Sequence, residues 1–487
     1  MEVALVVIFM AGVNPIKFGT DGWRGVIAAD FTFERVALLA PLAAYVLAEN
    51  YAAQTGSRLI IVGYDRRFLA EDFARTAAEA IQAAGFDVLL SESYAPTPAF
   101  SWAAKALNAL GAIVLTASHN PAKYLGLKVK GYFGGSVSPE ITGQIEALLN
   151  NPPVFDGPSG SLALFEPWES YCQGLRAKVD VNAIREAIAR GQLEVYADVM
   201  HGSAAGGLER LLGCPITELN SNRDPLFGGG APEPLPRNLG RILETIRQAS
   251  LLEEGLRVGL VFDGDSDRIA AVDGKGNFLS SQILIPILMG HFAGYKGRRG
   301  EIVKTVSGSD LIPKLASLWD LPLFETPIGY KYIADRMLTT PVLIGGEESG
   351  GVGYGDHIPE RDALLSALYL LEAVVESGKD LSTLYAEVQD KVGFHSEYDR
   401  IDLPLSGMEA REQLINTLAC EPLTEIAGRQ VIDCITVDGY KYRLADGSWL
   451  LIRFSGTEPV LRLYCEADTI DNVQAVLGWA KDWASYV

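Results

Sequence analysis

The sequence predicts an α/β protein of several domains, and three observations lead to this prediction. The chain has 487 residues, which at roughly 100–200 residues per domain suggests three or four domains. From Arg58 onward, short apolar β-branched runs alternate with segments that carry apolar residues at helical spacing. This alternation is typical of βαβ units whose parallel strands are covered by helices on both faces. The C-terminal part departs from it and is predicted to be a separate α+β unit.

The first strand–helix series lies in the N-terminal third of the chain. Apolar runs predict strands at 59–63, 86–90 and 111–115, and helical spacing predicts helices over 67–84 and 98–110. The alternation returns twice, with negligible sequence identity among the three series. The later strands are predicted at 193–197, 258–262, 301–305, 321–325 and 342–344, and the later helices over 204–212, 309–318 and 332–337.

The C-terminal unit combines short strands with one helix. Residues 431–467 contain several strand-like runs joined by tight turns such as Asp438-Gly439 and Asp446-Gly447. An amphipathic helix is predicted over 470–486.

Proline- and glycine-rich segments and changes of pattern place the domain boundaries. Residues 150–160 separate the first series from the second, and further boundaries fall just past the loop after Phe262 and near 390–398. The predicted domains are therefore 1–155, 156–270, 271–388 and 389–487.

Composition excludes several classes of protein. The net charge is −20 and 48% of the residues are hydrophobic, which suits a folded chain but not one whose main task is to hold nucleic acid. Five scattered cysteines without a CxxC pair favour free thiols in a reducing compartment over a zinc site. The apolar run at residues 1–13 is shorter than the about 20 residues of a membrane span. We expect either translation from Met10 or a loosely packed tail, no membrane-spanning segment and a cytoplasmic protein.

The first candidate site follows the strand predicted at 111–115. Open α/β sheets bind ligands at the carboxyl ends of their strands, and Thr116-Ala117-Ser118-His119-Asn120-Pro121 begins at such an end. Ser118 in this loop is a candidate nucleophile, and Lys128 is a candidate acid or base. Taken alone, the segment is also a common turn sequence.

The second candidate site follows the strand predicted at 258–262. Its aspartates, Asp263, Asp265 and Asp267, alternate in one turn, so they can face a single hard cation. An EF-hand is excluded because its sixth position is Arg268 and its twelfth is Gly274. Three carboxylates with few neutral ligands suit Mg²⁺.

Two more loops carry polar groups between glycines or beside arginines. Residues 345–351 (GGEESGG) follow a predicted strand and offer acceptors for sugar hydroxyls, although an acidic surface turn has the same composition. Residues 453–459 (RFSGTEP), with Arg462 beyond them, suit a phosphate dianion. No Gly-Lys step is followed by Ser or Thr, so the sequence has no Walker loop. A serine, a cation turn, a hydroxyl-binding loop and a phosphate pocket together indicate phosphoryl transfer on a phosphorylated sugar.

In this order, the motifs resemble those of the α-D-phosphohexomutase family. The segments that carry the resemblance are Phe18-Gly19-Thr20-Asp21-Gly22-Trp23-Arg24-Gly25, Thr116–Pro121, Asp263–Arg268, Gly345–Gly351 and Arg453–Pro459. The resemblance implies four domains around a central cleft. Three would be related βαβ-type domains with mixed sheets, and the fourth a C-terminal α+β domain of the TBP-like kind. The phosphoserine, metal, sugar and phosphate loops would lie in the four domains in that order.

The resemblance also implies a role for each matching residue. Ser118 would carry the phosphoryl group and would bind Mg²⁺ together with the three aspartates. Arg24, His119 and Arg268 would surround that phosphoryl group, and Lys128 would be the general acid or base. Residues implied to bind the substrate are Gly329, Tyr330 and Lys331, then Glu347 and Ser349, and finally Arg453, Ser455, Gly456, Thr457 and Arg462.

The implied reaction interconverts glucose 1-phosphate and glucose 6-phosphate through glucose 1,6-bisphosphate, which would also act as activator. The loop at 345–351, with Asp356-His357-Ile358 and Glu360-Arg361-Asp362 after it, is most similar to phosphoglucomutases. Dual action on mannose phosphates and net synthesis of the bisphosphate remain alternatives. A sugar-phosphate sensor would be expected to lack Ser118 or an aspartate of the turn. A phosphatase with Asp263 as nucleophile would not need Ser118.

Overall fold

The computed structural model describes residues 14–252, 254–455 and 459–486. The apolar N-terminal run, and with it the question of Met10, lies outside these residues, as do Gly456 and Thr457 of the predicted phosphate loop. The chain forms two compact units. The first unit runs to Ser280 and includes Met337–Thr339 and Ser349–Leu381, whereas the second consists of Ser281–Arg336, Thr340–Glu348 and Ser382–Val487.

The first unit begins with a mixed sheet whose strand order is β1-β2-β6-β5-β3-β4-β7. Its strands are β1 (Phe18–Gly19), β2 (Gly22–Val26), β3 (Leu59–Tyr64), β4 (Asp87–Ser91), β5 (Gly111–Leu115), β6 (Tyr124–Gly131) and β7 (Leu162–Phe165). Strand β3 is parallel to β4 and β5, whereas β6 is antiparallel to both β5 and β2. The parallel strands β3 and β5 therefore end at the same edge, where the loop containing Ser118 begins.

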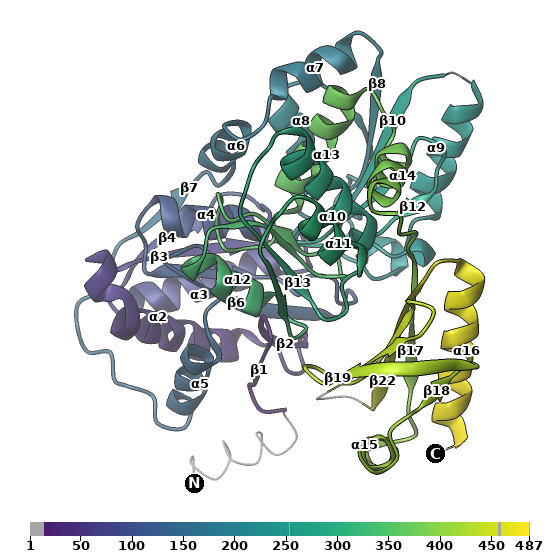
Figure 1. The fold of residues 1–487 in the computed structure, drawn as a ribbon. Coiled ribbons are helices and arrows are strands. Elements are labelled where there is room, and N and C mark those ends of the chain that lie inside the picture. Colours follow the sequence, from purple (N-terminus) through teal and green to yellow (C-terminus); the bar gives the residue numbers. More distant parts are fainter. Residues whose placement is uncertain (1–13, 253, 456–458, 487) are drawn as a thin grey trace. The chain divides into compact units, whose positions relative to one another are not determined.

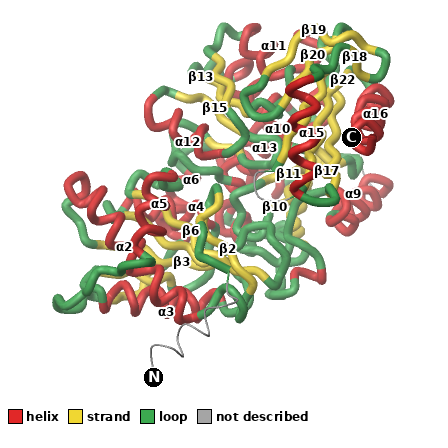
Figure 2. The backbone as a smooth tube through the Cα atoms, turned by 90° about the horizontal axis from the view of Figure 1, so that it is seen from below, coloured by secondary structure: helices red, strands yellow, loops and turns green. Residues whose placement is uncertain are grey.

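Helices cover both faces of this sheet. On one face, α2 (Phe33–Thr55) packs against α3 (Ala70–Ala83) and α5 (Pro139–Leu148), and α4 (Thr97–Ala106) lies across the sheet from α2 and α3 (Figures 1 and 2). By length and composition α2 could span a membrane, but half of its most apolar window is buried in the structure. It therefore serves as a core helix of this domain, a helix that the strand–helix rhythm did not predict.

A second mixed sheet in the first unit has the order β12-β11-β10-β8-β9. Its strands are β8 (Leu193–Asp198), β9 (Thr217–Leu219), β10 (Leu256–Phe262), β11 (Ile269–Val272) and β12 (Phe278–Leu279). Strand β10 is parallel to β8 and antiparallel to β11, so the aspartate turn connects β10 to an antiparallel neighbour.

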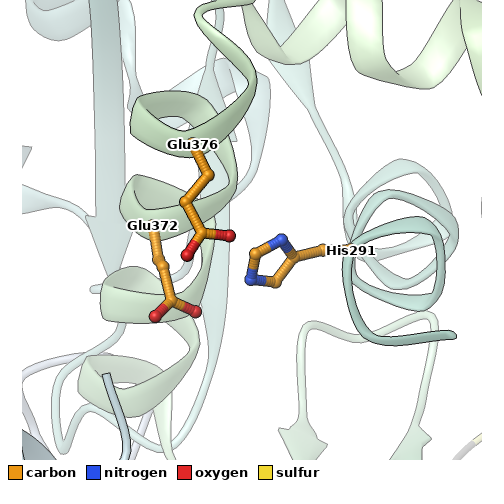
Figure 3. A group of neighbouring side chains, drawn as sticks. All are labelled: His291, Glu372 and Glu376. Atoms are coloured by element: carbon orange, nitrogen blue, oxygen red, sulfur yellow. The ribbon is translucent and has the colours of Figure 1, made fainter. Parts of the chain in front are cut away.

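Four helices accompany this second sheet. They are α7 (Val181–Ala189), α8 (Gly207–Leu212), α9 (Gly240–Leu252) and α13 (Ala363–Ser377). Helix α13 packs against α7 and β10, and it carries Glu372 and Glu376 one turn apart (Figure 3). The Glu372 carboxylate accepts a hydrogen bond from the Asp180 N–H at the start of α7, 3.1 Å away, and this contact anchors α13 to that helix.

The second unit begins with parallel strands in the order β14-β13-β15. The elements of this part are α10 (Ser281–Met289), η3 (Gly290–Tyr295), β13 (Glu301–Thr305), α11 (Leu311–Leu318), β14 (Leu323–Thr326), α12 (Tyr330–Thr339) and β15 (Val342–Gly346). The short strand β16 (Val352–Gly353), which follows the loop at 345–351, belongs to the first unit.

The C-terminal domain is an antiparallel sheet in the order β17-β22-β21-β20-β19-β18. It comprises β17 (Glu397–Pro404), α15 (Met408–Cys420), β18 (Glu425–Ile426), β19 (Arg429–Ile435), β20 (Tyr440–Leu444), β21 (Trp449–Phe454), β22 (Val460–Ala467) and α16 (Ile470–Tyr486). Successive side chains on a strand alternate between faces. Leu450 and Leu463 therefore pack in a core with α15 and α16, whereas Trp449 and Tyr464 pack with Val306 on the opposite face.

Several predicted element boundaries were wrong by a few residues. The helix predicted from residue 67 begins at Ala70, because Leu69 has a left-handed φ of 58° and Arg67 is used to hold the loop at Ser118. The helix predicted over 98–110 ends at Ala106, and the strand predicted at 321–325 is Leu323–Thr326.

Candidate active site

Ser118 lies in a strained loop that buried polar groups hold in place. Its φ of 50° is left-handed, a conformation that costs a non-glycine residue of order 1 kcal/mol. The Ser118 N–H donates to the Thr116 hydroxyl at 2.9 Å, and that hydroxyl donates to Asp65 at 2.6 Å. Arg67 donates to the Ser118 carbonyl at 2.6 Å. These contacts hold the backbone of the loop at Ser118 in place.

The Ser118 hydroxyl points at the aspartate turn that follows β10. Its Oγ donates to Asp263 Oδ2 at 2.9 Å, across 145 residues of sequence, and lies 3.3 Å from His119 Nδ1. Burial, followed by the nearby charges of Arg268 and Arg24, holds the pKa of His119 well below its usual value. The imidazole beside the serine is therefore neutral. Arg24 also donates to the Asn120 side chain at 2.8 Å, which places its guanidinium beside the same loop.

The three aspartates of the turn form a buried cluster. One oxygen each from Asp263, Asp265 and Asp267 lies within 4.8 Å of the others. Burial, and next the charges of Asp267 and Asp265, raise the pKa of Asp263 well above its ordinary value. Within the described residues, Asp265 Oδ1 and Asp267 Oδ1 are buried without a hydrogen-bond partner. Unpartnered buried carboxylate oxygens are costly, so the cluster fits a divalent cation with oxygen ligands.

The turn itself requires a left-handed residue. Ser266 has a φ of 61°, and its hydroxyl lies 3.1 Å from that of Ser203. This backbone conformation favours glycine. The hydrogen bond with Ser203 offsets part of the cost of a side chain here, and the three aspartates keep their places around it.

Lys128, the predicted acid or base, is held by three carboxylates. Its Nζ lies 2.7 Å from Asp21, 2.8 Å from Asp265 and 2.9 Å from Asp267, and its side chain is buried. Burial lowers the pKa of this amine, but Asp21, Asp265 and Asp267 outweigh burial and raise it above its usual value. The group is therefore a fixed cation that occupies one carboxylate oxygen, Oδ2, of Asp265 and of Asp267. Its role as acid or base stays a prediction.

The sequence did not indicate three further residues of this cluster. Arg361 donates to Asp21 at 2.6 Å and to Asp267 at 2.7 Å, and Thr97 donates to Asp265 at 2.6 Å. Asp21 lies in a segment that carries the family resemblance, and Arg361 lies in the segment 360–362 that is similar to phosphoglucomutases; these resemblances were the available signal for both residues. Thr97, at the start of α4, carried none.

A second group of charged side chains, Lys130 and Glu360, supports this cluster. Lys130 Nζ lies 3.1 Å from Asp21, donates to the Ser136 hydroxyl at 2.8 Å and pairs with Glu360 at 2.5 Å. Lys130 and Glu360 are fully buried, so each charge is stabilised by the other. The Lys130 ammonium therefore holds Asp21 in place, and Asp21 in turn orients Lys128 and Arg361.

The loop at 345–351 approaches the aspartate turn through its glycines. The Ile269 N–H donates to the Gly350 carbonyl at 3.0 Å, and Arg268 forms a β-bridge with Gly351. Gly350 has a φ of 102°, and a Cβ there would lie 3.0 Å from the Ile269 carbonyl oxygen. Only glycine fits this close approach. Glu347 and Ser349 lie in the same loop, between β15 and β16, with Glu347 buried.

In the second unit, the predicted phosphate residues lie on neighbouring strands. Arg453 of β21 is directly opposite Arg462 of β22, although like charges at such positions repel. The Arg453 Nε donates to Asp438 at 3.0 Å, while the buried Arg462 Nε has no hydrogen-bond partner among the described residues. Ser455 is buried, and its N–H donates to the Val460 carbonyl at 3.0 Å. This arrangement suits an anion.

The predicted loop of the third domain lies near the same carboxylate. Gly329 precedes α12 with a φ of 137°, Tyr330 is buried, and the Lys331 ammonium lies 4.8 Å from the Tyr332 ring. The preceding Ile328 N–H donates to Asp438 Oδ2 at 3.0 Å. Asp438 belongs to the predicted Asp-Gly turn, but sequence reasoning did not assign it to the site. It joins this loop to Arg453.

The fold and the site define an enzyme of the phosphohexomutase class. Models of the phosphoglucomutase/phosphomannomutase family match the chain in order. They cover α/β/α domain I at residues 15–153, domain II at 169–276, domain III at 281–392 and the C-terminal domain at 410–477. The chain belongs to this family, and its four domains are the three α/β domains and the C-terminal α+β domain predicted from the sequence.

Proteins similar to this chain are named for different sugar phosphates. A phosphoglucomutase/phosphomannomutase of Thermococcus kodakarensis is 29% identical over 94% of this chain and 96% of its own. A probable phosphoglucosamine mutase of Methanothermobacter thermautotrophicus is 30% identical to this chain, over 95% of this chain and 96% of its own. The crystal structure of a putative phosphomannomutase from Thermus thermophilus is 34% identical, with a TM-score of 0.84 over 97% of this chain and 100% of that one.

Proposed function

We propose that this enzyme interconverts glucose 1-phosphate and glucose 6-phosphate, with phosphorylated Ser118 as donor and glucose 1,6-bisphosphate as intermediate. One observation carries the proposal. The Ser118 hydroxyl donates at 2.9 Å to a buried aspartate cluster in which two further carboxylate oxygens have no hydrogen-bond partner among the described residues. A nucleophile beside a cation site is the arrangement that phosphoryl transfer needs.

Residues around Ser118 would position and neutralise the transferring group. Asp263, Asp265, Asp267 and the Ser118 oxygen would hold Mg²⁺, which would neutralise phosphoryl charge. Arg24 and Arg268 supply fixed positive charge near His119, as the lowering of its pKa by both arginines indicates. Because His119 is neutral, its ring nitrogen can exchange a hydrogen bond with the serine oxygen at 3.3 Å. Lys128 would act mainly by orienting the aspartates.

The other residues would hold the sugar and its second phosphate. Arg453 and Arg462, opposite one another on β21 and β22, would be stabilised by an anion between them. Glu347 and Ser349 would accept and donate hydrogen bonds to sugar hydroxyls. Gly329, Tyr330 and Lys331 would contact the sugar in its two orientations, and Ser455, Gly456 and Thr457 would complete the phosphate pocket.

The choice of sugar depends on the loop at 345–351. The Glu348 side chain, which belongs to the loop whose resemblance to phosphoglucomutases favours glucose, forms an ion pair with Arg400 at 3.2 Å. Sugar selection would therefore rest on Glu347 and Ser349 directly and on Glu348 only through the loop. Discrimination at one hydroxyl can be small when that hydroxyl is weakly contacted. Dual action on mannose phosphates is the alternative, and the phosphomannomutase names of similar proteins favour including it in the test.

The proposal is tested by phosphorus NMR of the purified enzyme with Mg²⁺, a trace of glucose 1,6-bisphosphate and glucose 1-phosphate. Parallel samples contain the mannose and glucosamine phosphates. Conversion of the glucose compound alone supports the proposal, and comparable mannose turnover makes the enzyme dual-specific. Turnover of glucosamine phosphate alone, or accumulation of bisphosphate or free phosphate, would contradict it.

Replacing the nucleophile separates the mutase from a phosphatase. Ser118→Ala should abolish nearly all turnover, since no other hydroxyl is placed against Asp263 in the described residues. A phosphatase that uses Asp263 as nucleophile would retain activity in this variant. The cytoplasmic location expected from the sequence stays a prediction.

A further inference from the structure

An ion pair connects the C-terminal sheet to the loop at 345–351. Arg400 lies on β17, and its Nη1 donates to Glu348 Oε1 at 3.2 Å and to Oε2 at 3.4 Å. The Glu348 side chain is 9% exposed and that of Arg400 is 25% exposed. Glu348 stands between Glu347 and Ser349, the residues proposed to bind the sugar. The pair therefore reaches the centre of that loop from another domain.

Arg400 and Glu348 each make a further contact besides their ion pair. The Arg400 Nη2 donates to Asp402 at 2.9 Å, and the guanidinium lies 5.7 Å from the ring of Tyr464. The Glu348 carbonyl accepts a hydrogen bond from the Ser281 hydroxyl at 2.7 Å, at the start of α10. Because the backbone and the side chain of Glu348 are each anchored, the conformation of the loop at this residue is restricted.

The register of the C-terminal sheet places Arg400 close to the two arginines predicted to bind phosphate, Arg453 and Arg462. Arg400 is opposite Tyr464, and Asp402 is opposite Arg462 on β22. Arg462 is in turn opposite Arg453 on β21. Side chains two residues apart on a strand share a face, so Arg400 lies on the same sheet face as both phosphate arginines. One face of this sheet thus carries the two arginines predicted to bind phosphate, Arg453 and Arg462, and the residue that contacts the sugar loop, Arg400.

We infer that Arg400 is a positioning residue that sets the geometry of the sugar loop through Glu348. The inference rests on the proposed function, because it assigns Arg400 to the sugar site of that reaction. A partly buried pair is weak evidence for a stabilising role. Because the pair joins Arg400 to the residue between Glu347 and Ser349 of the predicted sugar loop, a positioning role is the better account. Without Arg400 the Glu348 carboxylate would be left uncompensated, and the loop would rearrange to hydrate it.

The kinetic test is a double-mutant cycle on Arg400→Gln and Glu348→Gln, run with whichever hexose phosphate the wild type converts. Each single variant should lower kcat/KM about tenfold, mainly by raising KM. The double variant should also lose about tenfold rather than a hundredfold, because both changes remove one interaction. Arg400→Lys should recover most of the loss. Additive losses in the double variant, or a loss confined to kcat, would overturn the inference.

A second measurement does not depend on turnover. Hydrogen exchange of the amides at 345–351 should be faster in Arg400→Gln than in the wild type. The matched control is Arg429→Gln, which removes the ion pair with Asp446 from the same domain and leaves the loop alone. Unchanged exchange at 345–351 in Arg400→Gln, or an equal increase in the control, would refute the positioning role. A wild type inactive on every hexose phosphate would refute the proposed function while leaving the exchange result interpretable.

Discussion

Replacing Asp310 should destabilise the second unit strongly, because this carboxylate compensates buried cations. Asp310 Oδ1 lies 3.1 Å from Lys441 Nζ and 3.5 Å from Lys304 Nζ, and Oδ2 lies 4.0 Å from Arg443. The two lysine side chains are at most 1% exposed. In Asp310→Asn the shape is kept and the negative charge is removed, so two buried ammonium groups lose a partner.

The magnitude follows from the pKa of Asp310 and from the burial of its partners. Burial alone would raise this pKa, but Lys441, Lys304 and Arg443 together lower it from 3.8 to about 2. At about 1.4 kcal/mol per pKa unit, the ionised carboxylate contributes about 2–3 kcal/mol. Removing one partner of a buried pair costs about 3–5 kcal/mol. We therefore expect Asp310→Asn to lose about 3 kcal/mol at neutral pH.

The sign of the pH dependence is fixed by the direction of this shift. The pKa of Asp310 is lower in the folded than in the unfolded state, so its contribution is fully present above pH 3.8 and is lost as the pH falls toward about 2. The stability difference between wild type and Asp310→Asn should thus be largest above about pH 5 and should narrow below about pH 4. Lys441, whose pKa burial and next Lys304 lower to about 8, can release its proton in the variant and limit the loss.

The assay is urea-dependent hydrogen exchange of the amides in β20 and β22, measured from neutral pH down to about pH 3. The control is Asp446→Asn, which removes the partner of Arg429 where the aspartate is 39% exposed and should cost about 1 kcal/mol or less. The reasoning would be refuted if Asp310→Asn lost no more unfolding free energy than Asp446→Asn. It would also be refuted if the stability difference between wild type and Asp310→Asn grew as the pH fell.

Three further predictions concern the aspartate cluster. Arg361→Met should weaken Mg²⁺ binding about 10–100-fold, since Arg361 orients Asp267 and Asp21; calorimetric titration with Mg²⁺ measures this, and an unchanged affinity would exclude the orienting role. Thr97→Val removes a 2.6 Å donor to Asp265 and should weaken Mg²⁺ binding about tenfold in the same titration, whereas Thr97→Ser should restore it. Chelation with EDTA should lower the stability of the first unit by about 2.7 kcal/mol relative to Mg²⁺ at about a hundred times its Kd, and a melting temperature independent of Mg²⁺ would count against a cation site.

Sequence reasoning correctly placed together those site residues whose positions depend on neighbouring residues in the chain. Ser118 and the three aspartates each follow a buried strand, and such loops meet at the carboxyl edge of an α/β sheet. Asp263, Asp265 and Asp267 alternate within one turn, so their convergence is nearly fixed by chain geometry. The residues missed were distant in sequence. Thr97 is 168 residues from Asp265, a separation at which no spacing pattern applies.

The sequence by itself determined the fold class, the order of the motifs and the residue types that each loop carries, because these depend on periodicity and on residues close together in the chain. Tertiary structure alone decided which charges meet. It made Lys128, a candidate acid or base, a cation held by three carboxylates, and it made Glu348 of the predicted sugar loop the partner of Arg400. The physical reason is that a buried charge takes its protonation state and direction from its neighbours, and those neighbours come from distant parts of the chain.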